Sequence, residues 1–327
     1  LPDTWTGLWQ RRVRRVGDTM DQHRRPERGA CSVPIMPGAE PYSMGPIDAQ
    51  VACVVVHGFT GSPYEMRPFA ERLAARGVYV DVPLLPGHGT SVEDMSRTSF
   101  PDWVAGAEAA YLGLAARHRR TFVLGFSMGG LIALMLAARH NVDGVIVVSA
   151  PLRVRDPRAR FLPLIALVRK YEPPIPPTPQ SPHMPTTACA APPASPLSPA
   201  TLTGPSEMGS EERRTVSYSQ KPVVCIQSLI RLMQAVRAVT PRVQAPLLAA
   251  YGANDHTAPP EDGQWIVDHV GMGAGPGAGR DAVAGAPRRL VVLENSDHFG
   301  VFGPDRDRLL SEVEAFICDG IVFRPAR

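Results

Sequence analysis

Long apolar runs are missing from this chain of 327 residues, and no uncharged apolar stretch approaches the ~18 residues of a membrane-spanning helix. We therefore expect no stable membrane insertion. The formal net charge is only +3, which is too balanced to indicate nucleic-acid binding. The five cysteines are never spaced as Cys-x-x-Cys, which argues against a zinc ribbon or disulfide framework and fits a reducing, cytoplasmic compartment. The hydrophobic fraction of 44% excludes a wholly disordered chain.

Proline, in contrast, is abundant. Twelve of the 35 prolines fall in residues 173–205, so this stretch cannot form a helix or a central strand, and we expect it to be flexible. Residues 271–285, rich in Gly and Ala, predict a flexible surface loop. Residues 1–35 show no sustained period and lack the apolar segment of a secretory signal. They are interpreted as a disordered basic tail or as sequence upstream of the natural start, with a basic amphipathic helix over residues 6–16 as the alternative.

From residue 51 onwards, short apolar runs alternate with segments of helical spacing. Strands are predicted over 51–56, 78–82, 121–126, 145–148, 246–251 and 290–293, and helices over 64–76, 101–118, 128–139, 261–270 and 307–318. Such β-α alternation predicts an α/β fold with a mostly parallel central sheet and helices on both of its faces.

This alternation stops after residue 150 and resumes near residue 244. The pattern therefore predicts one core, formed by residues 36–150 and 244–327, with residues 151–243 inserted as a cap or lid. Helical spacing recurs within the insertion at 154–171 and 222–239. Apolar residues of these two stretches are candidates for the wall of an apolar pocket, or equally for plain cap core: Leu162, Leu164, Ile165, Leu229, Ile230, Leu232 and Met233.

Residues 125–130, Gly-Phe-Ser-Met-Gly-Gly, fit the pattern G-x-S-x-G between a predicted strand and a predicted helix. In such a nucleophile elbow the tight turn strains the backbone of Ser127, and side chains at Gly125 or Gly129 would clash. The N-terminus of the following helix favours negative charge in front of the serine. We predict that Ser127 is the nucleophile, the alternative being an incidental serine in a Gly-rich turn.

A serine hydroxyl needs a base, and behind such an elbow the chain order is serine, acid, histidine. Asp255 and His298 each follow a predicted strand, at the edge where ligands bind in open α/β sheets. We predict that His298 accepts the proton of Ser127 and that Asp255 orients the imidazole. His256 comes one strand too early to be the base, and Asp297 is adjacent to His298, where the required hydrogen-bond geometry is rare.

An oxyanion hole requires two backbone N–H groups, one from the residue after the nucleophile and one from an early loop. Met128 supplies the first, and Phe59, which follows the first buried strand, is predicted to supply the second. His57 and His88 are interpreted as histidines that fix their loops by hydrogen bonds. No His, Cys, Asp or Glu cluster has metal-ligand spacing, so no metal is expected.

Taken together, these pieces resemble the α/β-hydrolase superfamily and, within it, the bacterial carboxylesterase and monoacylglycerol lipase family. The resemblance extends over residues 36–327 and depends on His57–Pro63, Leu85–Gly89, Asp102 with Trp103, Gly125–Gly130, Asp255 and Glu294–His298. It implies an α/β-hydrolase fold with a small helical cap inserted after the sixth strand. It also implies a serine triad, no cofactor, and small-molecule acyl esters of short or medium chain, or monoacylglycerols, cleaved through an acyl-enzyme.

Four features depart from that family: the Pro-rich stretch, the insertion at 271–285, the run Phe299-Gly-Val-Phe after the histidine, and the basic tail. Alternatives on the same fold are a thioesterase, a peptidase or a C–C hydrolase. A further alternative is a non-catalytic binding protein, which the complete serine, acid and histidine set disfavours. The sequence does not indicate the oligomeric state.

Overall fold

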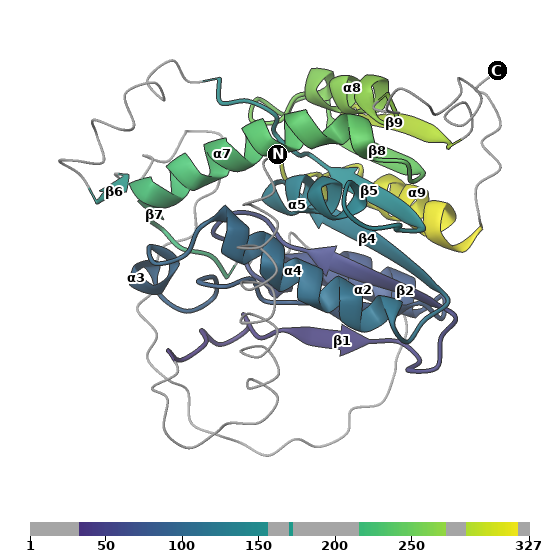
Figure 1. Ribbon diagram of the computed structural model, residues 1–327, viewed down its shortest axis with the longest axis horizontal. Coiled ribbons are helices and arrows are strands. Elements are labelled where there is room, and N and C mark those ends of the chain that lie inside the picture. The colour runs from purple at the N-terminus through teal and green to yellow at the C-terminus, as the bar shows by residue number, and fades with distance from the viewer. Residues whose placement is uncertain (1–32, 156–169, 173–215, 273–285, 320–327) are drawn as a thin grey trace.

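The computed structural model describes residues 33–155, 170–172, 216–272 and 286–319 (Figure 1). In this part of the chain a seven-stranded sheet has the order β1-β3-β2-β4-β5-β8-β9. Every neighbouring pair is parallel except β1 with β3. The strands are β1 (Tyr42–Met44), β2 (Val51–Val56), β3 (Tyr79–Val82), β4 (Arg120–Phe126), β5 (Gly144–Val148), β8 (Leu247–Gly252) and β9 (Arg288–Leu293).

Helices cover both faces of the sheet. One face carries α4, α5, α7 and α8, and the other carries α2 and α9. Short turns of helix complete the described part. The helical elements are η1 (Pro63–Met66), α2 (Arg67–Ala74), α3 (Val92–Met95), α4 (Phe100–Ala115), α5 (Met128–Ala137), α7 (Val223–Val239), η3 (Thr240–Arg242), α8 (Pro260–His269), η5 (Gly300–Phe302) and α9 (Arg306–Cys318).

The sheet lies between two hydrophobic clusters, one on each of its faces. Successive side chains of a strand point to opposite faces, so Val54 and Val56 of β2 pack under α4 and α5 while Cys53 and Val55 pack under α2. Both faces of the central strands are therefore buried, which explains why their sequences are continuous apolar runs rather than alternating ones.

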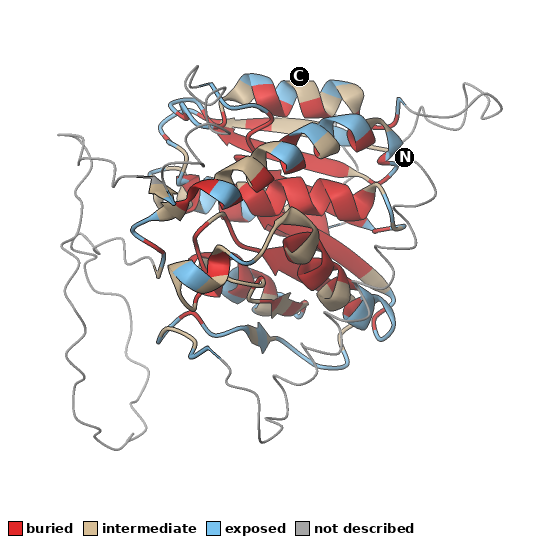
Figure 2. Cartoon of the chain, turned by 60° about the vertical axis from the view of Figure 1, so that its left-hand side comes forward, coloured by how far each residue is buried: buried red, intermediate tan, exposed pale blue. Residues whose placement is uncertain are grey.

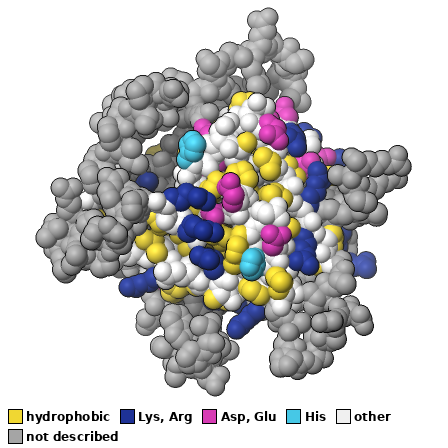
Figure 3. All heavy atoms as spheres, turned by 90° about the horizontal axis from the view of Figure 1, so that it is seen from above, with side chains coloured by type: hydrophobic (Ala, Val, Ile, Leu, Met, Phe, Trp, Pro, Cys, Tyr) yellow, Lys and Arg dark blue, Asp and Glu magenta, His cyan; other side chains and the backbone are white. Residues whose placement is uncertain are grey.

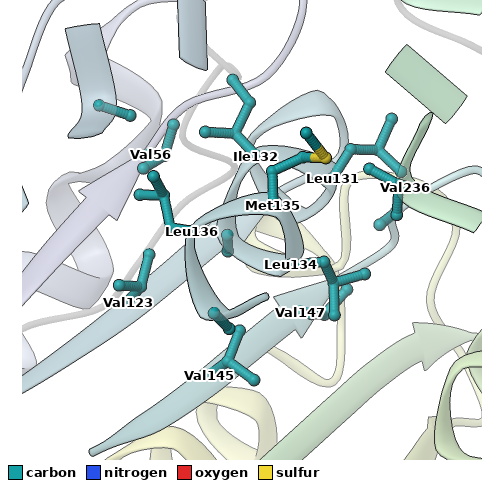
Figure 4. Packing of buried hydrophobic residues seen from close by; sticks show 14 of the residues in the cluster. Val56, Val123, Leu131, Ile132, Leu134, Met135, Leu136, Val145, Val147 and Val236 are labelled. Atoms are coloured by element: carbon teal, nitrogen blue, oxygen red, sulfur yellow. The ribbon is translucent and has the colours of Figure 1, made fainter. Parts of the chain in front are cut away.

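Helix α5 lies at the centre of the larger cluster and is buried on every side (Figure 2). Figure 4 shows Val123 and Val145 of the sheet on one side of it and Val236 of α7 on another. A helix that is apolar all round is stable in water only where neighbours enclose it. Enclosure by the sheet, α4 and α7 fixes the helix N-terminus, which directly follows Ser127.

The mostly parallel sheet with helices on both faces agrees with the prediction from the sequence. The insertion, however, follows β5, which is the fifth strand of the described sheet and not the sixth as we expected. Within the insertion, the structure describes the two-stranded sheet of β6 (Tyr171–Glu172) with β7 (Lys221–Pro222), and helix α7. Most of the helix expected at 154–171, all of the Pro-rich stretch 173–205, residues 1–32 of the tail and most of the loop 271–285 lie outside the described residues.

Val223–Arg242 is the stretch of the described chain that is long and apolar enough to cross a membrane, by length and composition alone. Its apolar side contacts α4 and α5, where Leu232 and Val236 are fully buried in the core. Packing against α4 and α5 therefore accounts for the buried apolar side chains of this helix. Viewed from above, the molecule presents basic, acidic and hydrophobic side chains side by side (Figure 3).

Candidate active site

Ser127 occupies a strained turn between β4 and α5. Its φ of 53° and ψ of −116° lie in a region that residues other than glycine rarely adopt. The turn is tight because its neighbours touch: a Cβ on Gly125 would overlap the backbone of Gly129, and a Cβ on Gly129 would overlap the carbonyl of Val56. The N–H of Ser127 donates to the carbonyl oxygen of Val148 at 2.8 Å. Two glycines and the flanking strand and helix thus hold the hydroxyl above the edge of the sheet.

The structure brings Ser127, His298 and Asp255 into one chain of hydrogen bonds. The Nε2 atom of His298 lies 3.0 Å from Oγ of Ser127, and its Nδ1 lies 2.7 Å from Oδ2 of Asp255. With Asp255 ionised, Nδ1–H donates to the carboxylate, and Nε2 accepts from the serine hydroxyl. Such a chain can transfer the hydroxyl proton to the imidazole and stabilise the charge that results.

Asp255 is itself fixed. Its side chain is fully buried, and its Oδ1 accepts the N–H groups of Thr257 and Ala258, both at 2.8 Å. The adjacent His256 is exposed, and the exposed Asp297 accepts the N–H of Phe299 at 2.9 Å. Because Asp255 follows β8 and His298 follows β9, parallel pairing of these strands brings both side chains to the same edge.

The loop over residues 57–61 lies directly against the elbow. A Cβ on Gly58 would be 3.6 Å from Cβ of Ser127, and a Cβ on Gly129 would be 2.8 Å from the carbonyl oxygen of His57. Met128 follows Ser127 as the first residue of α5. The two residues predicted to donate N–H groups, Phe59 and Met128, are therefore on the two chain segments that approach the serine.

His57 orients this loop. It is fully buried, and its Nδ1–H donates to the carbonyl oxygen of Gly58 at 2.9 Å while its Nε2 accepts the N–H of Leu85 at 3.2 Å. In a trans peptide the carbonyl and the following N–H point in opposite directions. Holding the Gly58 carbonyl therefore also fixes the direction of the Phe59 N–H. Burial lowers the pKa of His57 from 6.5 to about 4, so it stays neutral at pH 7.

Aromatic rings form a layer beneath the loop. Phe59 lies 5.8 Å from the buried Trp103 and 6.4 Å from His88, measured between ring centroids, and His88 lies 5.1 Å from His57. His88 is fully buried and its Nδ1–H donates to the carbonyl oxygen of Pro86 at 3.2 Å. Burial, with a smaller contribution from His57, lowers the pKa of His88 to about 3. Both histidines thus fix loops by hydrogen bonds.

The sequence reasoning missed three residues near this site. The ring of Phe299 lies edge-on to that of His298 and tilted against that of Phe126, with ring centroids 5.6 and 5.8 Å away. Glu65 is buried against Gly61. Tyr218, from the insertion, hydrogen bonds to the loops around residues 60 and 87. Only Phe299 had a signal, because its run departs from the pattern expected after the histidine. Tyr218 lies in a stretch without periodicity and had none.

No group of three or more His, Cys, Asp or Glu side chains within the described ranges could hold a metal ion. Of the proposed pocket residues in the insertion, Leu232 and Met233 are buried in the core and Leu229 packs partly against it. Leu162, Leu164 and Ile165 lie outside the described residues.

Comparison with known proteins relates most of the chain to one family. The family model described as "Serine aminopeptidase, S33" matches residues 47–274. A thermostable monoacylglycerol lipase of Bacillus sp. (strain H-257) is 30% identical over 291 residues, which cover 85% of this chain and 93% of the lipase. A carboxylesterase of Bacillus subtilis (strain 168) is 22% identical over 267 residues, covering 81% of this chain and 92% of the esterase.

Solved structures agree. A structure from the study of the metagenome-derived lipolytic enzymes LipS and LipT aligns with a TM-score of 0.66 and 28% identity, covering 88% of this chain and 100% of the other. A monoacylglycerol lipase of Paleococcus ferrophilus aligns with a TM-score of 0.57 and 15% identity, covering 86% of this chain and 100% of the lipase. At that identity the second match shows the fold alone. The predicted α/β-hydrolase fold is confirmed.

Proposed function

The chain belongs to the serine aminopeptidase S33 family of α/β-hydrolases and is an esterase- or lipase-like serine hydrolase, and we propose that it cleaves short- or medium-chain acyl esters, monoacylglycerols included, with Ser127 as nucleophile. The observation that carries the proposal is the unbroken chain of hydrogen bonds from Ser127 through His298 to Asp255. It supports a hydroxyl that can be deprotonated as it attacks an acyl carbon.

In the proposed mechanism His298 removes the proton of Ser127 as Oγ attacks the ester carbonyl. It then gives that proton to the departing alcohol, leaving an acyl-enzyme. A water molecule, deprotonated in the same way, attacks the acyl carbon and releases the acid. Asp255, held by two backbone N–H groups, keeps the imidazole in the tautomer that accepts at Nε2 and stabilises the imidazolium.

The tetrahedral intermediate carries its negative charge on the former carbonyl oxygen. We assign the N–H groups of Phe59 and Met128 to bind it. Contact between the 57–61 loop and the elbow supports this assignment, as does the position of Met128 at the N-terminus of α5, where the helix dipole favours negative charge. Loss of one such donor costs ~2.7–4 kcal/mol of transition-state stabilisation.

An ester substrate is favoured over a peptide by the named relatives. The first is a monoacylglycerol lipase and covers most of this chain, and the second is a carboxylesterase. The family description names an aminopeptidase, and a thioesterase domain shares the fold at 17% identity, so peptide and thioester substrates belong in the same assay. The cytoplasmic location remains a prediction.

Replacement of the nucleophile tests the assignment. Ser127→Ala removes the attacking oxygen and is expected to lower kcat toward p-nitrophenyl esters by about 10⁶-fold, with an unchanged melting temperature and no labelling by a fluorophosphonate probe. Ser311→Ala, a change on the exposed side of α9, is the matched control and keeps both activity and labelling.

Retained hydrolysis in Ser127→Ala would contradict the nucleophile assignment. A panel of p-nitrophenyl esters, monoacylglycerols, acyl thioesters and aminoacyl amides, assayed with the wild-type enzyme, would identify the substrate class. A higher kcat/KM on amides or thioesters than on every ester would overturn the proposed ester specificity.

A further inference from the structure

Tyr218 connects the inserted segment to two loops of the core. It lies ahead of α7 and is 8% exposed. Its phenol donates to the carbonyl oxygen of Gly87 at 2.9 Å and accepts the N–H of Thr90 at 2.8 Å. Burial raises the pKa of the phenol above its usual value of 10, so it remains a neutral donor throughout the range in which esterases are assayed. One side chain from the insertion therefore holds both ends of the 87–90 turn.

The main chain of Tyr218 reaches the loop that carries Phe59. Its N–H donates to the carbonyl oxygen of Thr60 at 3.2 Å. Thr60 has a φ of 64°, in the left-handed region that a β-branched residue rarely adopts. Such a conformation persists only where the surroundings hold it, and the hydrogen bond from Tyr218 is one contact that does so.

The 57–60 segment is consequently held at both ends. At its start, the buried ring of His57 binds the Gly58 carbonyl and the N–H of Leu85. At its end, Tyr218 binds the Thr60 carbonyl. Leu85 lies two residues ahead of Gly87, and its carbonyl oxygen accepts the N–H of His88 in the 87–90 turn at 3.0 Å, so the two attachments share one support.

The base of the insertion is also attached to the core through α7, the helix that follows Tyr218 in the chain. The hydroxyl of Ser228 on α7 accepts the N–H of Phe100 at 2.7 Å, and the thiol of Cys225 donates to the carbonyl oxygen of Met95 at 3.2 Å. Both partners lie in or beside the segment that follows the 87–90 turn. Tyr218 is thus part of a fixed framework.

We propose that Tyr218 is a positioning residue for the oxyanion hole: from the base of the insertion it fixes the loop that directs the Phe59 N–H toward the position where negative charge develops. The inference rests on the proposed function. It implies that removal of the phenol oxygen weakens binding of the transition state more than binding of the substrate, because loop placement matters most when the oxyanion forms.

Tyr218→Phe tests the proposal, because it removes only the phenol oxygen and keeps the ring in place. The expected result is a fall in kcat of about tenfold, well short of the loss of a whole oxyanion donor, with KM within twofold of wild type. The affinity for a trifluoromethyl ketone, which forms a hemiketal anion with the serine, falls by the same factor as kcat/KM. If Tyr218 had only a structural role, Tyr218→Phe would lower the melting temperature without this matched fall in kcat/KM and in ketone affinity.

Tyr171→Phe is the matched control. Tyr171 also lies at the base of the insertion, but its phenol donates to the exposed Glu93 at 3.0 Å, and no hydrogen bond among the described residues joins it to the 57–60 loop. Its removal is expected to leave kcat and the affinity for the ketone unchanged. Both variants are also made together with Gly113→Ala, because alanine stabilises an exposed helix interior and Gly113 has open space around its Cα.

Unchanged kcat and ketone affinity in a folded Tyr218→Phe would overturn the proposal, and so would a rise in KM at constant kcat. If the variant does not fold even with Gly113→Ala, the phenol is a structural part of the core and the proposal is likewise wrong. These outcomes can be read only if the wild-type protein hydrolyses esters. Failure of the proposed function would instead appear as a wild-type protein inert toward every ester.

Discussion

A buried carboxyl beside the loop over residues 57–61 is expected to make the stability of this protein depend on pH. Glu65 lies in η1 and is 4% exposed, and a Cβ on Gly61 would collide with its carboxyl group. No ion pair reaches it from the part of the chain that the structure describes. Burial raises its pKa from 4.5 to about 8, because removal from water disfavours the charged form of the carboxyl. The folded protein therefore carries Glu65 protonated at neutral pH.

The sign of the pH effect follows from the two states. The unfolded chain releases this proton near pH 4.5, whereas the folded chain keeps it until near pH 8. The stability that the neutral carboxyl contributes is fully present below pH 4.5 and is lost as the pH rises toward 8. Each pH unit inside that window costs ~1.36 kcal/mol. Raising the pH from 5 to 7 therefore removes about 3 kcal/mol of the free energy of unfolding.

Glu65→Gln removes this dependence, because an amide has the shape of the protonated carboxyl and does not titrate. Relative to wild type, the variant is expected to gain about 3 kcal/mol of stability between pH 5 and pH 7. Urea unfolding at pH 5, 6 and 7, followed by tryptophan fluorescence, measures the gain. Any constant cost of burying the amide cancels in the difference.

Glu71→Gln is the control for Glu65→Gln, because Glu71 is an exposed residue of the adjacent helix α2. It forms a surface ion pair with Arg67, and such pairs contribute only ~0.3–0.5 kcal/mol. Its stability curve should run parallel to that of wild type between pH 5 and pH 7. If the curve of Glu65→Gln were parallel as well, the carboxyl of Glu65 would titrate alike in both states and the reasoning would be wrong.

Two further substitutions, Gly129→Ala and Asp262→Ala, test contacts made by the backbone, and Gly113→Ala is the comparison for the first. Gly129→Ala places a methyl group against the carbonyl of Val56 and should lower both activity and stability, the latter by about 1–3 kcal/mol. Gly113→Ala, which adds its methyl group in open space, should instead stabilise the protein by ~0.5–1 kcal/mol. Equal melting temperatures of the two variants would contradict the crowding argument. The buried N–H of Leu152 donates to the side chain of Asp262 at 3.0 Å. Asp262→Ala removes this acceptor, and urea unfolding should show that the free energy of unfolding falls by about 1–3 kcal/mol.

Most of the sheet could be predicted from the sequence because its strands are buried on both faces. Such strands read as continuous apolar runs, and β2, β4, β5 and β8 all do. The edge strand β1 escaped prediction because its burial is only partial and its three residues are short of any readable period. The sheet of β6 with β7 escaped for a similar reason, since each strand has two residues and depends on pairing across the insertion.

The candidate triad could be predicted because each member follows an apolar strand, and parallel strands bring their carboxyl ends to one edge. The contacts that surround it could not. Glu65 is distinguished from a surface glutamate only by what covers it. Tyr218 acts through hydrogen bonds to Thr90 and Gly87, which are 128 and 131 positions away in the chain. Neither relation leaves a period or a motif. His57 was interpreted as a loop-fixing residue, and its hydrogen bonds to Gly58 and Leu85 agree with that interpretation.

Three buried titratable groups in or beside the loop over residues 57–61, namely His57, His88 and Glu65, carry no net charge at neutral pH. His57 and His88 have pKa values lowered to about 4 and 3, and Glu65 has its pKa raised to about 8. Stabilisation of an oxyanion here would therefore come from backbone N–H groups and the α5 dipole rather than from fixed charges.

This neutrality limits how the enzyme can respond to acid. Protonation of His57 would place a hydrogen on Nε2, where the N–H of Leu85 now donates, and so would break the support of the 57–60 loop. With a pKa near 4, that disruption occurs only below about pH 5. A loss of activity between pH 5 and pH 7 would therefore not come from protonation of His57 or His88, because both are already neutral across that range.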